Sequence, residues 1–301
     1  MARRKKGRPV HGWVIIDKPA GPSSTAVVGK VRWAFEAQKA GHAGTLDPEA
    51  TGLLAIALGE ATKTIPYVTD ALKAYDFTVR FGQATNADDA EGKVTATSDN
   101  RPSAADITAT LPAFTGDIEQ VPPAFSAVKI DGERAYKRAR DGDIPTLAAR
   151  PLFVESLTLL EMLDTDHARL EMVCGKGGYV RAIARDLGET LGCFGHVRKL
   201  RRTWSGPFSV DQSTTLEDIE ATARTPDIAA FLQPIDAGIP DLPHATVSEI
   251  AAGRIRNGNA AEVTTTDANF GETALAVCKG TPLAIGTYRA GMLDPTRVFN
   301  L

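Results

Sequence analysis

Strand-like and helix-like segments follow one another in this chain without the regular alternation that a parallel α/β fold requires. Residues 12–16 (GWVII) and 53–58 (LLAIAL) are apolar runs typical of buried strands, whereas residues 73–82 alternate polar and apolar side chains. This irregular order predicts an α/β chain of the α+β type, with a mixed, mainly antiparallel sheet and flanking helices. It excludes a Rossmann fold and an alternating barrel.

The same patterns place the other elements that precede the C-terminal tail. Helices are expected at residues 23–41, 103–111, 133–140 and 179–191, and further strands at residues 125–130, 152–163, 168–174 and 196–202. Ser103 and Asp106 form a capping-box pattern, in which each side chain binds the other residue's backbone N–H at the start of a helix. The first helix should begin at Ser23 or Ser24 and end near Gly41.

The chain is 301 residues long, which exceeds what one hydrophobic core usually organises. A proline-rich passage over residues 234–243 precedes a tail with a short helix near residues 248–252 and several short strands. We therefore expect a basic arm at residues 1–11, a main domain at residues 12–240 and a small β-rich domain at residues 241–301.

The composition excludes several protein classes. Hydrophobic residues make up 43% and charged residues 24% of the chain, which excludes a disordered, collagen-like or coiled-coil protein. No apolar run approaches the roughly 20 residues of a membrane helix, so a cytoplasmic protein without a targeting sequence is expected. Cys174, Cys193 and Cys278 lie far apart, which predicts buried thiols rather than disulfides or a CxxC site.

A net charge of −3 conceals two basic clusters. The first cluster consists of Arg3, Arg4, Lys5, Lys6 and Arg8, and the second of Arg198, Lys199, Arg201 and Arg202. The arm is either a solvated tail or a segment that follows a phosphate backbone. The second cluster should lie on a strand that spreads its charges over two faces.

The most informative passage is GHAGTLDPEATGLL, at residues 41–54. Its glycines allow the backbone to approach a ligand closely, Pro48 fixes a turn, and Asp47 is presented at the entrance to an apolar strand. An aspartate before a proline is also a common turn or helix cap. Spacing alone leaves both interpretations open.

This passage, with the upstream DKPAGPSS, resembles the active-site segment of the TruB family of tRNA pseudouridine synthases. Three further segments resemble the family in the same order: KAYDFTVRFGQATNADDAEG, QVPPAFSAVKIDGERAYKRARDG, and KGGYVRAIARDLG with HVRKLRR. The resemblance spans about residues 11–208. The tail segment ATVSEIAAGRIRNGNAAEV resembles the start of a PUA domain, a small RNA-binding β-barrel. Asn86-Ala87 depart from the family pattern, in which a Thr or Asp is common.

The resemblance implies a pseudouridine synthase fold and an enzyme that isomerises uridine-55 in the T-loop of tRNA after flipping the base out of its stack. This isomerisation involves no net redox change, so neither a cofactor nor a metal is expected. The sequence also carries no P-loop and no GxGxxG pattern after a strand. The implied partner is tRNA, no membrane partner is expected, and the chain should act as a monomer.

The resemblance also assigns residues. Asp47 is the nucleophile, Arg181 pairs with it through a planar fork of hydrogen bonds, and Tyr75 stacks on the flipped base. The residues implied to contact the substrate or brace the site are His42, Tyr179, Leu200 and Lys18. Without the resemblance, Arg181 would be interpreted as a surface charge and Tyr75 as a core residue.

Two other functions stay open. One is a non-catalytic tRNA-binding or tRNA-folding module, although the presence of Asp47, Tyr75 and Arg181 argues against it. The other is a hydrolase that uses Asp47 with Glu49. Glycoside hydrolysis needs two carboxylates on opposite sides of the bond, and neighbours two residues apart in a Gly/Pro loop are poorly placed for that.

Overall fold

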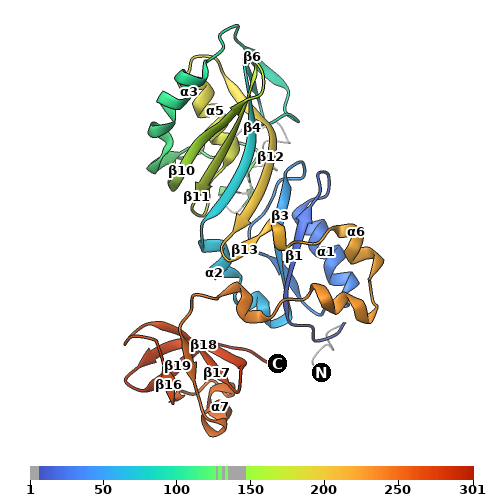
Figure 1. Ribbon diagram of the computed structural model, residues 1–301, viewed down its shortest axis with the longest axis vertical. Coiled ribbons are helices and arrows are strands. Elements are labelled where there is room, and N and C mark those ends of the chain that lie inside the picture. Colours follow the sequence, from blue (N-terminus) through green and yellow to red (C-terminus); the bar gives the residue numbers. More distant parts are fainter. Residues whose placement is uncertain (1–6, 127, 131–132, 135–146) are drawn as a thin grey trace.

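Nine strands of the chain form one sheet, and six strands near the C-terminus form another (Figure 1). The structure is a computed structural model that describes residues 7–126, 128–130, 133–134 and 147–301. The larger sheet contains β1 (Gly12–Lys18), β2 (Ala40–His42), β3 (Thr51–Leu58), β4 (Lys73–Phe81), β7 (Gly116–Gln120), β10 (Arg150–Met162), β11 (His167–Cys174), β12 (Gly195–Ser205) and β13 (Phe208–Ser209).

The strand order of the larger sheet is β1-β3-β12-β4-β11-β10-β7, with β2 beside β3 and β13 beside β12. Within the described part of this sheet, β12 and β3 pair in parallel and the other neighbours pair antiparallel. This confirms the mixed, mainly antiparallel sheet. The central strands β4 and β12 are long and extend from the upper into the middle part of the molecule in Figure 1.

Both faces of β1 are buried, which explains its continuous apolar sequence. Val14 and Ile16 pack with α1 (Ser24–Ala34) and α6 (Leu216–Ala221), while Trp13 packs on the other side with Phe208. At the other end of the sheet, α3 (Ala104–Thr110) and α5 (Val180–Thr190) pack against β4, β10 and β11. The remaining short helical segments are α2 (Ile65–Asp70), η1 (Gly59–Lys63), η2 (Leu111–Phe114), η3 (Val210–Gln212), η4 (Pro226–Phe231) and η5 (Ile235–Gly238).

Several expected elements are confirmed at their local signals. Ser103 caps α3 through the complete capping box with Asp106, and Ser23 caps α1. The expected end of the first helix near Gly41 is wrong. Glu36 adopts φ 52°, the Ala37 N–H donates to the Arg32 carbonyl at 2.9 Å, and residues 40–42 join β3 as a strand. This left-handed helix end satisfies the last carbonyls and stops α1.

The segment around residue 130 differs from expectation. Strand β8 (Lys129–Ile130) is shorter than the expected strand at residues 125–130, and it pairs with β9 (Glu133–Arg134), where a helix was expected to begin. The rest of that helix, residues 135–140, and residues 1–6 of the basic arm lie outside the described residues. A second short hairpin, β5 (Gln83–Thr85) with β6 (Val94–Thr97), follows β4.

The tail forms the small β-rich unit expected from its sequence. Its strands are β14 (His244–Thr246), β15 (Ala261–Glu262), β16 (Thr265–Thr266), β17 (Thr273–Cys278), β18 (Thr281–Arg289) and β19 (Met292–Val298), with α7 (Glu249–Arg256) packed against them. Its contact with the main body includes an apolar cluster, in which Leu275, Ile285 and Phe299 pack with Trp13 and Phe208. The backbone N–H of Asn300 also donates to Glu60 at 3.0 Å. The tail is therefore docked on the larger unit.

Two expectations from composition can be compared with the structure. Cys174, Cys193 and Cys278 are free and buried, which confirms buried thiols. No helix in the described part of the chain is long and apolar enough to cross a membrane.

Candidate active site

The loop that carries Asp47 connects β2 to β3 and is held by buried polar side chains. The Lys18 ammonium donates to the carbonyls of Pro19, Pro48 and Ala50 at 2.8, 2.6 and 2.7 Å. The Ser24 hydroxyl donates to the Leu46 carbonyl and accepts from the Leu46 N–H, both at 2.8 Å. The backbone on both sides of Asp47, at Leu46 and Pro48, is thus held by hydrogen bonds. This fixes the position from which the Asp47 side chain extends.

Of the two roles expected for Lys18, contact with the substrate or bracing of the site, the geometry favours the second. Its side chain is fully buried, and three carbonyls accept its three N–H groups, so it braces the loop. Burial lowers the pKa of Lys18 from 10.5 to about 8, although nearby Glu49 and Asp47 oppose that shift.

The expected pairing of Asp47 with Arg181 is present. The Arg181 Nε lies 3.0 Å from Asp47 Oδ2, and the Asp47 side chain is 45% exposed while that of Arg181 is only 6% exposed. The planar fork expected between them is wrong, because the other two nitrogens of Arg181 donate elsewhere, to the carbonyls of Ala87 and Phe125, each at 2.9 Å. Arg181 therefore links the Asp47 loop to two further loops.

A second acid at this arginine was missed from the sequence. Asp89 Oδ2 lies 3.4 Å from Arg181 Nη1. Burial raises the pKa of Asp89, and the Arg181 guanidinium opposes that shift. The preceding Asp88 adopts φ 59° and pairs with Arg185, one turn after Arg181 on α5. The sequence shows two adjacent acids, Asp88 and Asp89, but no local pattern indicates that their side chains face the arginines of α5.

Two tyrosines lie near Asp47. Tyr75 on β4 is 8% exposed, and burial raises the pKa of its hydroxyl, an effect that the neighbouring Arg202 partly offsets. Tyr179 precedes α5 and is half-buried. The Gln120 side chain accepts from its backbone N–H at 2.9 Å and donates to its carbonyl at 3.2 Å. Burial also raises the pKa of Tyr179, and Asp47 contributes to the electrostatic environment of both rings.

The remaining two expected residues lie at the margin of this group. Leu200 on β12 is partly buried and packs against the same core cluster as Tyr75. His42 ends β2, and burial together with Arg202 lowers its pKa, so the imidazole is neutral at pH 7. Its Nδ1 is buried and has no hydrogen-bond partner among the described residues. The structure thus places Asp47, Arg181, Tyr75 and Tyr179 near one another, with Lys18 bracing the loop and His42 and Leu200 at the margin.

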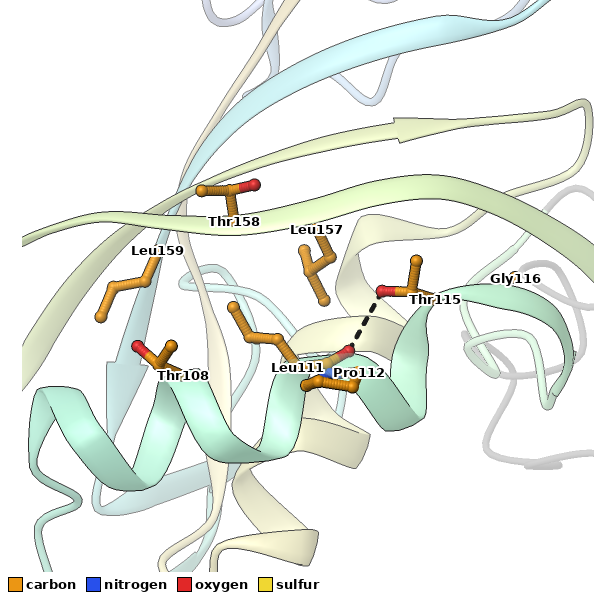
Figure 2. A pocket seen from close by; sticks show the side chains of 8 residues that line it. All are labelled: Thr108, Leu111, Pro112, Thr115, Gly116, Leu157, Thr158 and Leu159. Atoms are coloured by element: carbon orange, nitrogen blue, oxygen red, sulfur yellow. Dashed lines mark hydrogen bonds between the residues drawn. The ribbon is translucent and has the colours of Figure 1, made fainter.

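A separate hollow lies away from the Asp47 loop. It measures about 600 Å³ and lies between α3, η2 and β10, where Leu111, Leu157 and Leu159 line it together with threonines (Figure 2). None of the expected site residues borders it. The Asp47 side chain itself is 45% exposed. Within the described residues, no group of three His, Cys, Asp or Glu side chains could hold a metal ion.

Comparison with known proteins identifies the family of the chain. The sequence model of the TruB family pseudouridylate synthase N-terminal domain matches residues 32–180, and that of the tRNA pseudouridylate synthase B C-terminal domain matches residues 181–239. The tRNA pseudouridine synthase B of Dinoroseobacter shibae is 67% identical over 99% of this chain and 98% of its own length. The chain belongs to the TruB family.

Other TruB relatives are similar over their full length. The tRNA pseudouridine synthase B of Roseobacter denitrificans is 62% identical over 100% of this chain and 99% of its own. Among solved structures, a chain of a Cbf5-Nop10-Gar1 complex has a TM-score of 0.74 at 24% identity, covering 96% of this chain and 85% of that chain. This structural likeness confirms the pseudouridine synthase fold of the TruB-family chain.

Proposed function

We propose that this TruB-family protein isomerises uridine-55 in the T-loop of tRNA to pseudouridine. The observation that carries the proposal is the Asp47–Arg181 ion pair at 3.0 Å, on a braced loop beside Tyr75 and Tyr179. The full-length similarity to proteins named tRNA pseudouridine synthase B supports tRNA as the substrate.

The reaction breaks the bond between C1′ of the ribose and N1 of uracil, turns the base and joins C1′ to C5, from which a proton leaves. It needs one carboxylate that can attack the ribose or the base. Asp47 meets that need, because its side chain is partly exposed and Arg181 fixes its direction. We assign Arg181 to positioning the nucleophile and the two tyrosines to holding the flipped base.

The base must leave the stacked T-loop before Asp47 can reach it. An aromatic platform can hold an extruded uracil by stacking. Tyr75 offers such a ring from a rigid central strand, and burial keeps its hydroxyl protonated by raising its pKa. Tyr179 and Leu200 provide the other sides of the base site in this proposal, and His42 contacts the displaced T-loop.

We further propose that residues 12–240 form the catalytic domain and residues 241–301 an RNA-binding domain of the PUA type. The second sheet is built entirely from strands within residues 244–298, which supports this division. Its docked position makes it available to a long RNA that also reaches Asp47.

The test is to incubate the protein with unmodified tRNA transcript, without added metal or nucleotide, and to map pseudouridine at single-nucleotide resolution. We expect one modified position, uridine-55, and none in a transcript with cytidine at that position. The Asp47→Asn variant should be inactive, and Glu49→Gln should serve as the matched control in the same loop. Modification at another position would refute the site assignment, release of free uracil would indicate a hydrolase, and binding without modification would indicate a non-catalytic module.

A further inference from the structure

Among the residues that the structure describes, no carboxylate pairs with the buried Arg202. It lies on β12, only 1% of its surface is exposed, and it takes part in none of the ion pairs found among the described residues. Its neighbour Arg201, in contrast, is 41% exposed and pairs with Asp17. Burying an unpaired cation is unfavourable unless hydrogen bonds satisfy it, so the contacts of Arg202 show what it holds.

The Arg202 guanidinium binds the start of the Asp47 loop and the strand that follows it. Its Nε donates to the Leu53 carbonyl at 2.8 Å, Nη2 to the Gly44 carbonyl at 3.1 Å and Nη1 to the Thr45 carbonyl at 3.4 Å. Gly44 has φ +97°, a conformation that favours glycine, and a Cβ there would lie 3.4 Å from Arg202 Nη1. The backbone of the loop thus follows the guanidinium closely.

The backbone of Arg202 joins the two strands that carry the reactive groups. Strand β12 lies between β3 and β4, and Arg202 is the cross-strand partner of Gly52 on one side and of Tyr75 on the other. A Cβ at Gly52 would lie 2.2 Å from the Arg202 carbonyl oxygen, so only glycine permits this approach. Arg202 therefore touches the Asp47 loop with its side chain and the Tyr75 strand with its backbone.

We propose that Arg202 is a positioning residue that fixes the distance and direction between the Asp47 loop and Tyr75. The proposal rests on the proposed function, because it assigns these two groups to the same reaction. Arg202 is too deeply buried to touch RNA, so it acts through the groups it holds.

A lysine cannot replace this arginine. The three carbonyls are bound by three different nitrogens of one planar group, whereas an ammonium is a single point donor. The nearby Lys73 already directs two of its three N–H groups to the carbonyls of Thr69 and Ala71, at 2.8 and 2.6 Å, so it cannot replace a set of three donors. Arg202→Lys should therefore keep the positive charge but lose the hydrogen bonds to three carbonyls that hold the Asp47 loop and β3.

The experiment compares Arg202→Lys with Arg101→Lys. Arg101 serves as a control because it also donates to backbone carbonyls, those of Ser98 and Asn100, while its Nε pairs with Asp166, and none of these partners is an expected site residue. For each variant we would measure the single-turnover rate of pseudouridine formation at saturating tRNA, the dissociation constant for tRNA, and the folded fraction. We expect Arg202→Lys to lower the rate by about a hundredfold with the dissociation constant within about threefold, and Arg101→Lys to change neither.

A second measurement needs no RNA. Incorporation of 3-fluorotyrosine labels the five tyrosines, and Tyr75→Phe assigns the ¹⁹F signal of Tyr75. In Arg202→Lys the Tyr75 signal should shift while the others stay in place, and in Arg101→Lys none of them should move. If Arg202→Lys does not fold, Arg202→Gln takes its place in both measurements.

The outcomes separate the two proposals. A normal rate in Arg202→Lys, or a rate that falls only in proportion to the folded fraction with all tyrosine signals altered, would overturn the role of Arg202. An inactive wild-type protein would overturn the proposed function instead, and an unmoved Tyr75 signal would still refute the link through Arg202.

Discussion

The two larger sheets of this molecule are stabilised by different kinds of residue. All of the buried polar and charged side chains identified lie in the larger unit, among them the cations Lys18, Lys73, Arg181 and Arg202. Residues 206–301, which the structure describes in full, contribute only apolar side chains to the buried set. Buried cations are expensive to desolvate, so their concentration around one loop indicates that geometry there is maintained at the expense of stability.

The C-terminal unit follows the opposite principle. Its core consists largely of alanines with a few larger residues such as Ile255 and Leu293. Such a core stabilises a fold by packing alone and places no charged group in a fixed direction. The comparison suggests that substitutions in the larger unit should affect rate, and those in the C-terminal unit should affect stability or RNA affinity.

The largest effect is expected for Asp47→Asn. Removing the nucleophile should lower the rate of pseudouridine formation by at least about a thousandfold, while tRNA affinity stays within about threefold because phosphate contacts remain. Single-turnover assays and filter binding on the same preparation measure both quantities. Glu49→Gln, two residues away and exposed, should behave like the wild type. Near-normal turnover in Asp47→Asn would remove the basis for the proposed function.

Arg181→Lys should lower the rate on the order of a hundredfold with little change in tRNA affinity. Three nitrogens of Arg181 meet three separate groups, Asp47, the Ala87 carbonyl and the Phe125 carbonyl, and a lysine can satisfy only part of this set. A pH series is the informative measurement. Because the expected defect is geometric, raising the pH should restore little activity, and full recovery at high pH would show that Arg181 acts by its charge alone.

The control for Arg181→Lys is Arg169→Lys. Arg169 lies on β11, is 45% exposed and pairs with Asp76 across the sheet. An exposed ion pair of this kind contributes little to stability and does not reach the Asp47 loop. Its replacement should leave the rate unchanged.

Ile255→Ala tests the other half of the comparison. Ile255 is fully buried on α7, so its truncation should lower the free energy of unfolding by about 2 to 4 kcal/mol. The single-turnover rate at saturating tRNA should not change, as measured on protein shown to be folded. A point substitution is preferable to removal of the tail after residue 241, because removal would uncover the shared core around Trp13 and Phe208. A lower saturating rate in Ile255→Ala would show that the two units are coupled in catalysis.

Much of the fold was predictable because its signals are local. Alternation over residues 73–82 gave β4, the Ser103–Asp106 capping box gave the start of α3, and the proline-rich passage marked the tail. The end of α1 was not predictable, since it depends on a left-handed residue, Glu36, that is not a glycine. In this case backbone geometry set by the neighbouring strand decided the boundary.

The site was predictable only in part, for a related reason. The expected residues Asp47, Tyr75 and Arg181 do lie near one loop. Arg202 was expected only on a strand that spreads its charges over two faces, and nothing in the sequence indicated that its side chain is buried. Its acceptors Leu53 and Gly44 lie 149 and 158 residues away in sequence. A buried cation whose partners are distant carbonyls leaves no local pattern.

The smallest expected effect is a pH dependence of stability that comes from the larger unit. Burial lowers the pKa of Lys18 and of Lys73 from 10.5 to about 8. Between pH 8 and 10.5 the unfolded chain therefore binds more protons at these lysines than the folded protein does. Their contribution makes the free energy of unfolding rise with pH in this window, and it is lost as the pH falls through 8.

Lys73→Met isolates this contribution. The buried thiol of Cys174 acts in the opposite direction, because burial raises its pKa to about 12, so only the difference between wild type and variant is informative. Calorimetric unfolding at pH 9 in buffers of different ionisation enthalpy counts the protons taken up, and Lys73→Met should lower that number by about one. Lys279→Met is the matched control in the C-terminal unit, where Lys279 is 77% exposed and pairs with Glu249, and it should leave the number unchanged. An equal decrease in both variants would mean that the proton uptake does not arise from buried lysines. Buried cations would then no longer distinguish the larger unit from the C-terminal unit.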